Sequence, residues 1–456
     1  MKLLATGILL FLILLALREP SATSSELGQS GDAATIYDPS PSHIWNRLYD
    51  ALIVRRDQTG ARIVGETLDP LFWDQTEHLL AGSSHSIALR VLDEFLRTHA
   101  ENQIRDPAKR ALLQRNLWAV FDWSARRGDN HIGERRELQI RLARVLRRLA
   151  LTGEEIKSLP DNYAQAIASG AFARAYDPEN RERVFLPPDL LQAKGPWVCI
   201  RGDSRPVAGD HVGTFSGRSR FLVFVRLPQG RTATVGYFRT LWNARETWTG
   251  SEVDNVRGEL NPDLPQFPVG TQVALLRQMM LFDDAGRLVP APVTESLQIR
   301  VYRTITSRRD HNNITIDWPA ARTEQDFYEI RLSQALLLAG QAGGLRAVGR
   351  SETEFPLFHT QGDDFFELAA KQHTTPPAAR PEPGSRILFG CANCHSAPGI
   401  NSVQSRRHLL KPNRVQLDPD PPYDAMWWET EATANYKAHE YDWGLLNGYW
   451  RASVAP

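Results

Sequence analysis

The chain has 456 residues, more than one hydrophobic core usually organises, so two or three domains are expected. Hydrophobic residues make up 42% and charged residues 23%, which is an ordinary globular composition. Because 53 basic residues balance 53 acidic ones, the chain lacks the positive charge with which proteins neutralise nucleic-acid phosphates, and no nucleic-acid partner is expected.

The N-terminus carries a targeting pattern. Met1-Lys2 places a positive charge before an almost wholly apolar stretch from Leu3 to Leu17, and Arg18-Glu19-Pro20 ends that stretch. This pattern is typical of a signal peptide, so residues 1–22 are predicted to direct export to the bacterial periplasm. The apolar stretch is shorter than the ~20 residues of a spanning helix, but retention of residues 3–17 as an N-terminal anchor stays open.

The first third of the exported chain is predicted to be helical. Residues 23–40 are rich in Ser, Gly, Ala and Asp without periodicity, which predicts a linker. From residue 41 to residue 180, apolar residues recur at helical spacing, as in Leu138, Leu142 and Val145, so we expect an α-helical domain. Asp106-Pro107 has the pattern of a helix start with proline in the first turn.

Residues 181–375 follow a different pattern, with short runs rich in Val, Phe, Tyr and Thr between Gly, Pro and Asp turns. Such runs predict strands, and the region is expected to be a mixed, mainly β domain. Asp283-Asp284-Ala285-Gly286 predicts a hairpin turn, because Gly286 can take a positive φ. A helix is predicted from Glu324 to Leu338. The predicted strands are Trp197–Ile200, Phe221–Leu227, Thr232–Phe238, Val273–Phe282 and Leu297–Thr304.

One histidine of this region lies among acidic residues. Asp203, Asp210 and His211 are close in sequence, yet their spacing fixes no catalytic geometry, and no zinc-protease, hydrolase or phosphate-loop pattern accompanies them. We therefore expect His211 to be an ordinary hydrogen-bonded loop histidine.

The most specific pattern is Cys391-Ala392-Asn393-Cys394-His395, which follows a proline-rich linker. Two cysteines three positions apart, followed directly by histidine, form the c-type haem attachment pattern: each thiol adds to one vinyl group, and the histidine binds the iron. A thiol redox pair and half of a zinc site also fit two cysteines at this spacing. These two alternatives stay open.

In this pentapeptide the chain resembles the c-type cytochromes, and the resemblance covers little else. It implies a covalently bound haem c, with thioether bonds from Cys391 and Cys394 and His395 as proximal iron ligand. Met426 is the first candidate for the other axial position, because it follows a loop stiffened by Pro421 and Pro422. His408 is the alternative, and an open iron is a third. Met426 could equally be a core residue, and His408 part of a solvated basic patch.

Aromatic residues are concentrated near the C-terminus. Trp427, Trp428, Trp443 and Trp450 could cover the broad apolar faces of a haem, and plain hydrophobic packing explains the same residues. Because these tryptophans follow the motif closely in the sequence, haem contact is the favoured role.

The sequence thus predicts a multidomain α+β protein with an N-terminal α-helical domain, a central mainly β domain and a short, mostly helical haem-binding segment. The expected function is electron transfer through one haem iron, with an unidentified redox partner protein. The alternatives are a catalytic haem oxidoreductase with an open distal site and an interaction or scaffold protein with a haem appendage. The predicted parts are a signal peptide or anchor (1–22), a linker (23–40), a helical domain (41–180), a mainly β domain (181–375) and a c-type haem-binding segment (376–456).

Overall fold

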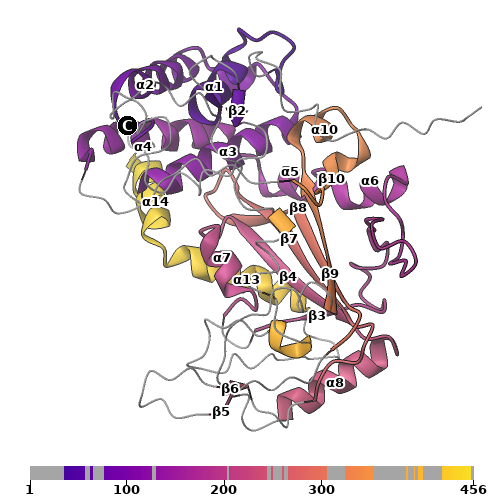
Figure 1. Cartoon of the computed structure of the whole chain (residues 1–456). Helices are drawn as coiled ribbons and strands as arrows, with labels where there is room; N and C mark the ends of the chain where they lie inside the picture. Colours follow the sequence, from indigo (N-terminus) through magenta and orange to yellow (C-terminus); the bar gives the residue numbers. More distant parts are fainter. Residues whose placement is uncertain are drawn as a thin grey trace, which may run out of the picture.

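The fold is α+β, with N-terminal helices above a central sheet and C-terminal helices beside it (Figure 1), as the sequence predicts. The structure is a computed structural model of the whole chain. The residues that it describes are 35–56, 62–64, 77–125, 130–202, 205–243, 248–249, 259–260, 265–305, 324–352, 387–388, 395, 399–403 and 424–452.

The N-terminal region is helical, as its apolar spacing predicts. Leu138, Leu142 and Val145 are fully buried on one side of α4, which packs against α2 and α3. Asp106 Oδ1 accepts a hydrogen bond from the backbone N–H of Ala108 at 2.8 Å, which confirms the predicted helix start. The elements are α1 (Ile44–Leu52), β1 (Arg55–Arg56), β2 (Arg62–Val64), α2 (Gly82–Arg97), η2 (Ala100–Asn102), α3 (Pro107–Ala125), α4 (Ile132–Leu149), α5 (Gly153–Lys157) and α6 (Asn162–Ser169).

The central sheet has six strands in the order β10-β9-β8-β7-β4-β3, and every neighbouring pair is antiparallel. Successive side chains of a strand point to opposite sides of a sheet. We call the side on which Leu222 and Phe224 lie face A, and the side on which Phe221 and Val223 lie face B. The strands are β3 (Val198–Ile200), β4 (Ser219–Arg226), β7 (Gln272–Phe282), β8 (Leu288–Tyr302), β9 (Gln325–Leu332) and β10 (Leu345–Ala347).

The turn between β7 and β8 is the predicted hairpin turn. Gly286 has a φ of +77°, which favours glycine. The Asp283 carboxylate accepts hydrogen bonds from the backbone N–H groups of Ala285 at 3.0 Å and of Arg287 at 2.8 Å. The turn residues therefore satisfy their own backbone donors.

The strand predicted over Thr232–Phe238 is wrong, because this segment lies within helix α8 (Arg231–Asn243). The run was assigned from its β-branched and aromatic residues. In the structure Thr234, Phe238 and Leu241 are buried at helical spacing, and Phe238 and Leu241 belong to the apolar cluster on face B. Burial of this stripe outweighs the local strand preference.

The helix predicted from Glu324 to Leu338 is also wrong over most of its length. Strand β9 (Gln325–Leu332) pairs with β8 and β10, and only α10 (Gln334–Leu338) is helical. Ser333 caps α10 by accepting a hydrogen bond from Leu336 N at 3.2 Å. A buried inner strand shows little alternation, so its pattern resembles that of a helix.

The C-terminal helices are α13 (Ala425–Ala438) and α14 (Tyr441–Ala452). In α14, Trp443 lies 6.0 Å from Trp118 and Trp450 lies 5.1 Å from Phe282, measured between ring centroids. These two tryptophans thus complete the core of the N-terminal helices, which is the plain packing role. The remaining described elements are α7 (Gly209–Thr214), β5 (Trp248–Thr249), β6 (Glu259–Leu260), η4 (Ala342–Gly344) and η5 (Gly399–Ser402).

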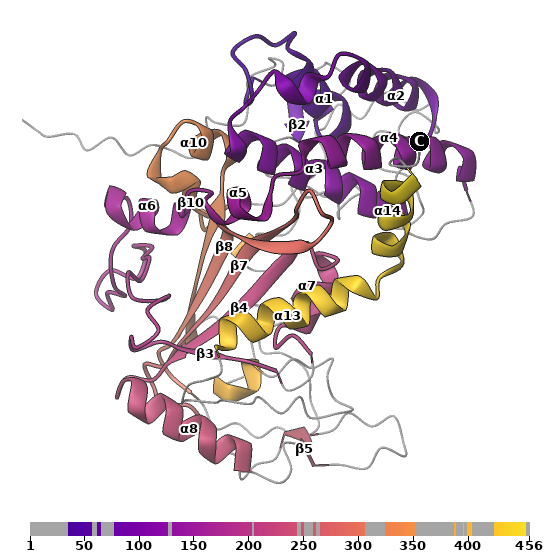
Figure 2. The same ribbon diagram turned by 180° about the vertical axis from the view of Figure 1, so that it is seen from behind.

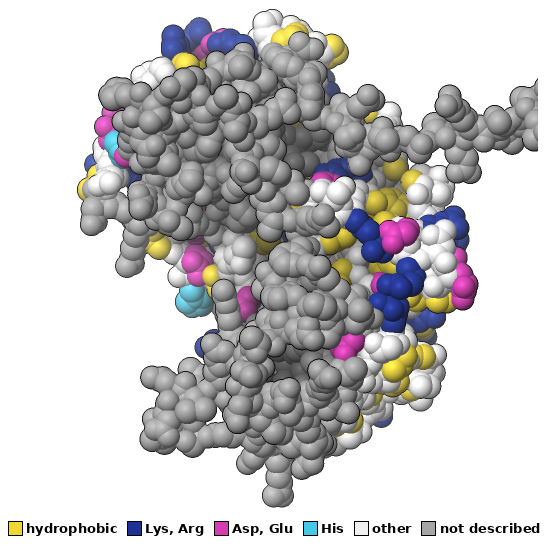
Figure 3. All heavy atoms as spheres, viewed as in Figure 1, with side chains coloured by type: hydrophobic (Ala, Val, Ile, Leu, Met, Phe, Trp, Pro, Cys, Tyr) yellow, Lys and Arg dark blue, Asp and Glu magenta, His cyan; other side chains and the backbone are white. Residues whose placement is uncertain are grey.

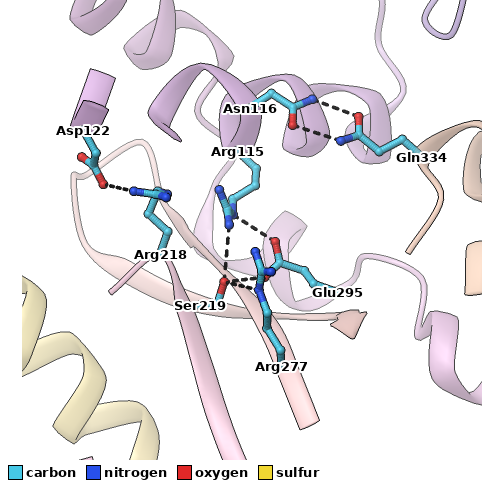
Figure 4. Close-up of polar contacts among 8 residues, drawn as sticks. All are labelled: Arg115, Asn116, Asp122, Arg218, Ser219, Arg277, Glu295 and Gln334. Carbon is cyan, nitrogen blue, oxygen red and sulfur yellow. Dashed lines mark hydrogen bonds and ion pairs between the residues drawn. The ribbon is translucent and has the colours of Figure 1, made fainter. Parts of the chain in front are cut away.

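Polar contacts join α3 to the sheet (Figure 4). Glu295 of β8 pairs with Arg115 of α3 and with Arg277 of β7, both at 3.0 Å. Asn116 of α3 and Gln334 exchange two amide hydrogen bonds, of 2.9 and 3.0 Å. Because α3 and the sheet share these contacts, the two regions have a fixed relative position.

A buried charge cluster lies between α3, the start of β4 and the C-terminal helices. Lys437 Nζ donates to Asp122 Oδ2 at 2.8 Å and to Asp442 Oδ1 at 2.7 Å. Arg218 donates to the same Asp122 oxygen at 2.8 Å. Lys437, Asp122 and Arg218 are at most 1% exposed, so each of these charges depends on the others for compensation.

The described surface mixes charges of both signs. On the face shown in Figure 3, Lys and Arg side chains lie beside Asp and Glu side chains. Within the described ranges, no helix combines the length and the apolar character that crossing a membrane requires. The predicted signal segment, residues 1–22, lies outside those ranges.

Candidate haem site

Of the residues predicted to hold a haem, His395 and Met426 are described, whereas Cys391, Cys394 and His408 lie outside the described residues. The site is therefore built from His395, the last residue of the attachment motif, and from the elements around it.

The His395 side chain is held by the short helix that follows it. Its Nδ1 lies 2.8 Å from the backbone carbonyl oxygen of Ser402 in η5, so Nδ1 carries the proton and donates. The His395 carbonyl oxygen accepts from Gln325 Nε2 of β9 at 3.1 Å. With Nδ1 protonated, Nε2 is the nitrogen with the free lone pair that can bind a metal.

Ser402 is itself fixed to the sheet. Arg300 of β8 donates to the Ser402 carbonyl oxygen at 3.2 Å and to its hydroxyl at 2.9 Å, and the hydroxyl of Tyr302 also contacts the Ser402 hydroxyl. Tyr302 and Arg300 are buried. The orientation of His395 is thus set by buried residues of the sheet.

The turn that begins η5 requires glycine. Gly399 has a φ of +52°, and a Cβ added there would lie 2.0 Å from Gln266 Oε1. That same oxygen accepts from the backbone N–H of Ile400 at 2.7 Å. The close approach of Gln266 therefore anchors the start of the helix whose last carbonyl orients His395.

A second imidazole lies opposite His395. His211 is on α7, and its ring centroid is 6.1 Å from that of His395, with only 7° between the ring planes. The Phe221 ring, on face B, lies 5.4 Å from the His211 ring. The expectation of a loop histidine is wrong, because His211 belongs to helix α7, and its ring plane is nearly parallel to that of the motif histidine.

The segment before α7 is anchored by Glu429 of α13. One carboxylate oxygen accepts from the backbone N–H of Gly202 at 2.9 Å, and the other accepts from that of Val207 at 3.0 Å. Val207 lies two residues before Gly209, the first residue of α7, so this buried carboxylate fixes the backbone from which the helix of His211 begins.

Protein stability is expected to fall between about pH 4.5 and pH 7 because of Glu429. Burial raises the pKa of Glu429 from 4.5 to about 7, although its two backbone hydrogen bonds and the nearby Arg201 favour the charged form. A carboxyl whose pKa is raised in the folded state stabilises the fold at low pH and loses that contribution as the pH rises through the folded pKa. We expect a loss of about 1–3 kcal/mol. Urea unfolding of the wild type and of Glu429→Gln measures it; equal pH dependence in the two would contradict this role.

Both imidazoles are suited to metal binding. Burial and the charge of Arg300 lower the pKa of His395 to about 3, and burial also lowers the pKa of His211. The folded protein therefore holds two neutral rings, and neutral imidazole is the form that binds iron. With an oriented Nε2 on His395 directly after Cys394, the described residues fit a c-type haem.

Met426 lies on the other side of the sheet. It is in the first turn of α13 and packs against the cluster that contains Leu222 and Phe224, on face A. His211 contacts Phe221, and Ser402 contacts Tyr302, which clusters with face B residues. Figure 1 shows α7 in front of the strands, and Figure 2 shows α13 in front of them from behind. The structure therefore favours the core role of Met426.

Comparison with known proteins adds no assignment. No protein-family model matches the chain, and no curated protein or solved structure matches it either. The case for a haem site therefore depends on the attachment pattern and on the geometry around His395.

Proposed function

We propose that this chain is an exported monohaem c-type protein that transfers electrons. Haem c would be bound covalently by Cys391 and Cys394, with His395 as the proximal iron ligand. The observation that carries the proposal is the hydrogen bond of 2.8 Å between His395 Nδ1 and the Ser402 carbonyl. This hydrogen bond leaves Nε2 of His395 as the metal-binding nitrogen. His395 is the residue that the attachment pattern requires as an iron ligand.

The residues around His395 have defined roles in this function. The Ser402 carbonyl selects the tautomer and increases the basicity of the ligating nitrogen. Arg300, which donates to that same carbonyl, reduces its acceptor strength and so tunes how basic His395 becomes. When bound, the haem supplies a metal centre that accepts and releases one electron. Because Arg300, Tyr302 and Ser402 are buried, these contacts would hold the His395 ring in one orientation.

The cellular context follows from the N-terminal pattern. Residues 1–22 would direct export to the periplasm, where bacteria attach haem to such motifs, and residues 3–17 would be the only membrane contact if they are retained. The partner would be a redox protein that donates or accepts one electron.

The test is haem analysis of the full chain produced in bacteria that mature c-type cytochromes. We expect a pyridine haemochrome spectrum of haem c, haem stain that survives acid-acetone extraction and denaturing electrophoresis, and a reversible one-electron potentiometric titration. A variant that lacks residues 1–22 should remain cytoplasmic and without haem. A full-length product without covalent haem, or covalent haem on the truncated form, would contradict the proposal.

A further inference from the structure

Two imidazoles on face B bear on which residue would occupy the second axial position of the haem iron. His211 and His395 come from segments far apart in the sequence, yet the fold brings their rings together in a nearly parallel arrangement. His395 is the motif histidine, so the residue opposite it is the first candidate for the other side of the iron.

The spacing of the two rings matches a shared metal ion. Imidazole nitrogen binds transition metals at about 2.0 Å, and a ring centroid lies about 1.1 Å behind its ligating nitrogen. Two imidazoles on opposite sides of one ion therefore have centroids about 6.2 Å apart. The observed distance is 6.1 Å, whereas parallel rings in face-to-face contact would be only about 3.5–4 Å apart.

The ring nitrogens are available for this role. In His395, Nδ1 is engaged by the Ser402 carbonyl, and Nε2 makes no hydrogen bond to the described residues. The His211 ring makes no hydrogen bond to any residue in the described part of the chain, and its flank contacts the apolar ring of Phe221. Offset packing of two aromatic rings also occurs at this centroid distance. It does not explain why two half-buried imidazoles both keep a nitrogen without a hydrogen-bond partner among the described residues.

The helix that carries His211 is firmly placed. Val212 is fully buried, Phe215 is covered by the guanidinium of Arg277 at 3.6 Å from its ring centroid, and Glu429 holds the backbone just before α7. A ligand on such an element needs little reorganisation when it binds, which favours a permanent bond over an exchangeable one.

We propose that His211 is the second axial ligand of the haem iron. This inference rests on the proposed function, and it makes the iron six-coordinate with two histidines. Such an iron has no open position for a substrate, so the site is a low-potential electron carrier and not a haem catalyst, because a methionine ligand would raise the potential.

The inference is tested by spectroscopy of the full-length haem protein. We expect a low-spin spectrum in both oxidation states, the near-infrared magnetic circular dichroism band of two histidines, and a rhombic ferric electron paramagnetic resonance signal, which near-parallel imidazole planes give. His211→Ala should give a high-spin ferric form that added imidazole returns to low spin. His211→Met should shift the reduction potential upward.

Matched variants identify the ligand independently. His439→Ala removes an exposed histidine from the end of α13 and should leave the spectrum unchanged, as should Met426→Ala and His408→Ala. The inference is overturned if the unmutated protein shows a His/Met signature, or if His211→Ala keeps the low-spin spectrum. In both cases covalent haem would still be present and the proposed function would stand. Absence of covalent haem from the wild type would overturn both.

Discussion

Replacing Cys391 and Cys394 together with alanine is expected to abolish covalent haem attachment. Each thiol supplies one thioether bond, and without either bond the haem is held only by its axial ligands and by packing. Acid-acetone extraction should then remove all haem, and haem stain after denaturing electrophoresis should fall to background. Each single variant keeps one thioether and should retain part of the stain.

Cys199→Ala is the matched control for the double variant. Cys199 is free and packs partly buried against the face A cluster, so its replacement should leave haem attachment unchanged. Stain that persists in the double variant would exclude attachment at this motif. Metal analysis of the same preparations distinguishes the two alternative roles of these cysteines. A zinc site would contain bound zinc, whereas a thiol redox pair would contain neither zinc nor iron.

Lys437→Met is expected to lower the free energy of unfolding by about 3–5 kcal/mol, the usual cost of removing one partner from a buried ion pair. The change leaves the Asp122 and Asp442 carboxylates without the ammonium that bridges them, at 2.8 and 2.7 Å. Among the described residues, Arg218 then remains as the ion-pair partner of Asp122. Urea unfolding at neutral pH measures the loss.

The cause of that loss can be checked in three ways. Burial, and then the charge of Asp122, raise the pKa of Asp442 to about 6, so the penalty should shrink near pH 5, where this carboxyl takes up a proton. Adding Asp442→Asn should restore part of the stability. Lys157→Met breaks an exposed pair with Glu154 and should leave the free energy of unfolding nearly unchanged. A similar loss in both lysine variants would contradict the role of buried charge.

Local sequence patterns predicted those parts of the fold that depend on local contacts. Asp106-Pro107 predicted the start of α3 because the cap is formed by the neighbouring residues, and Gly286 predicted the β7–β8 turn because its φ is a local requirement. The helical spacing of Leu138 and Leu142 likewise appears in α4. These signals need no knowledge of the rest of the chain.

The errors fall where distant contacts decide the outcome. Thr232–Phe238 is helical because Phe238 packs in a cluster that gathers residues of β3, β4, β7 and β8. Gln325–Leu332 is a strand because β8 and β10 flank it. The same distinction between local and distant contacts applies to the two histidines of the candidate site. The motif marks His395, but nothing in the sequence around His211 marks it as a ligand, since only the folded sheet brings the two rings together.

The edges of the six-stranded sheet bear on how copies of this protein meet. The outer strands β3 and β10 are three residues each, so they expose few backbone groups on which another chain could add a strand. The first residues of β4, Ser219 to Leu222, have no β3 residue paired beside them. Helices α7 and α13 both contact β4. Among the described residues, the shortness of β3 and β10 thereby disfavours the addition of a strand from another copy at these two strands.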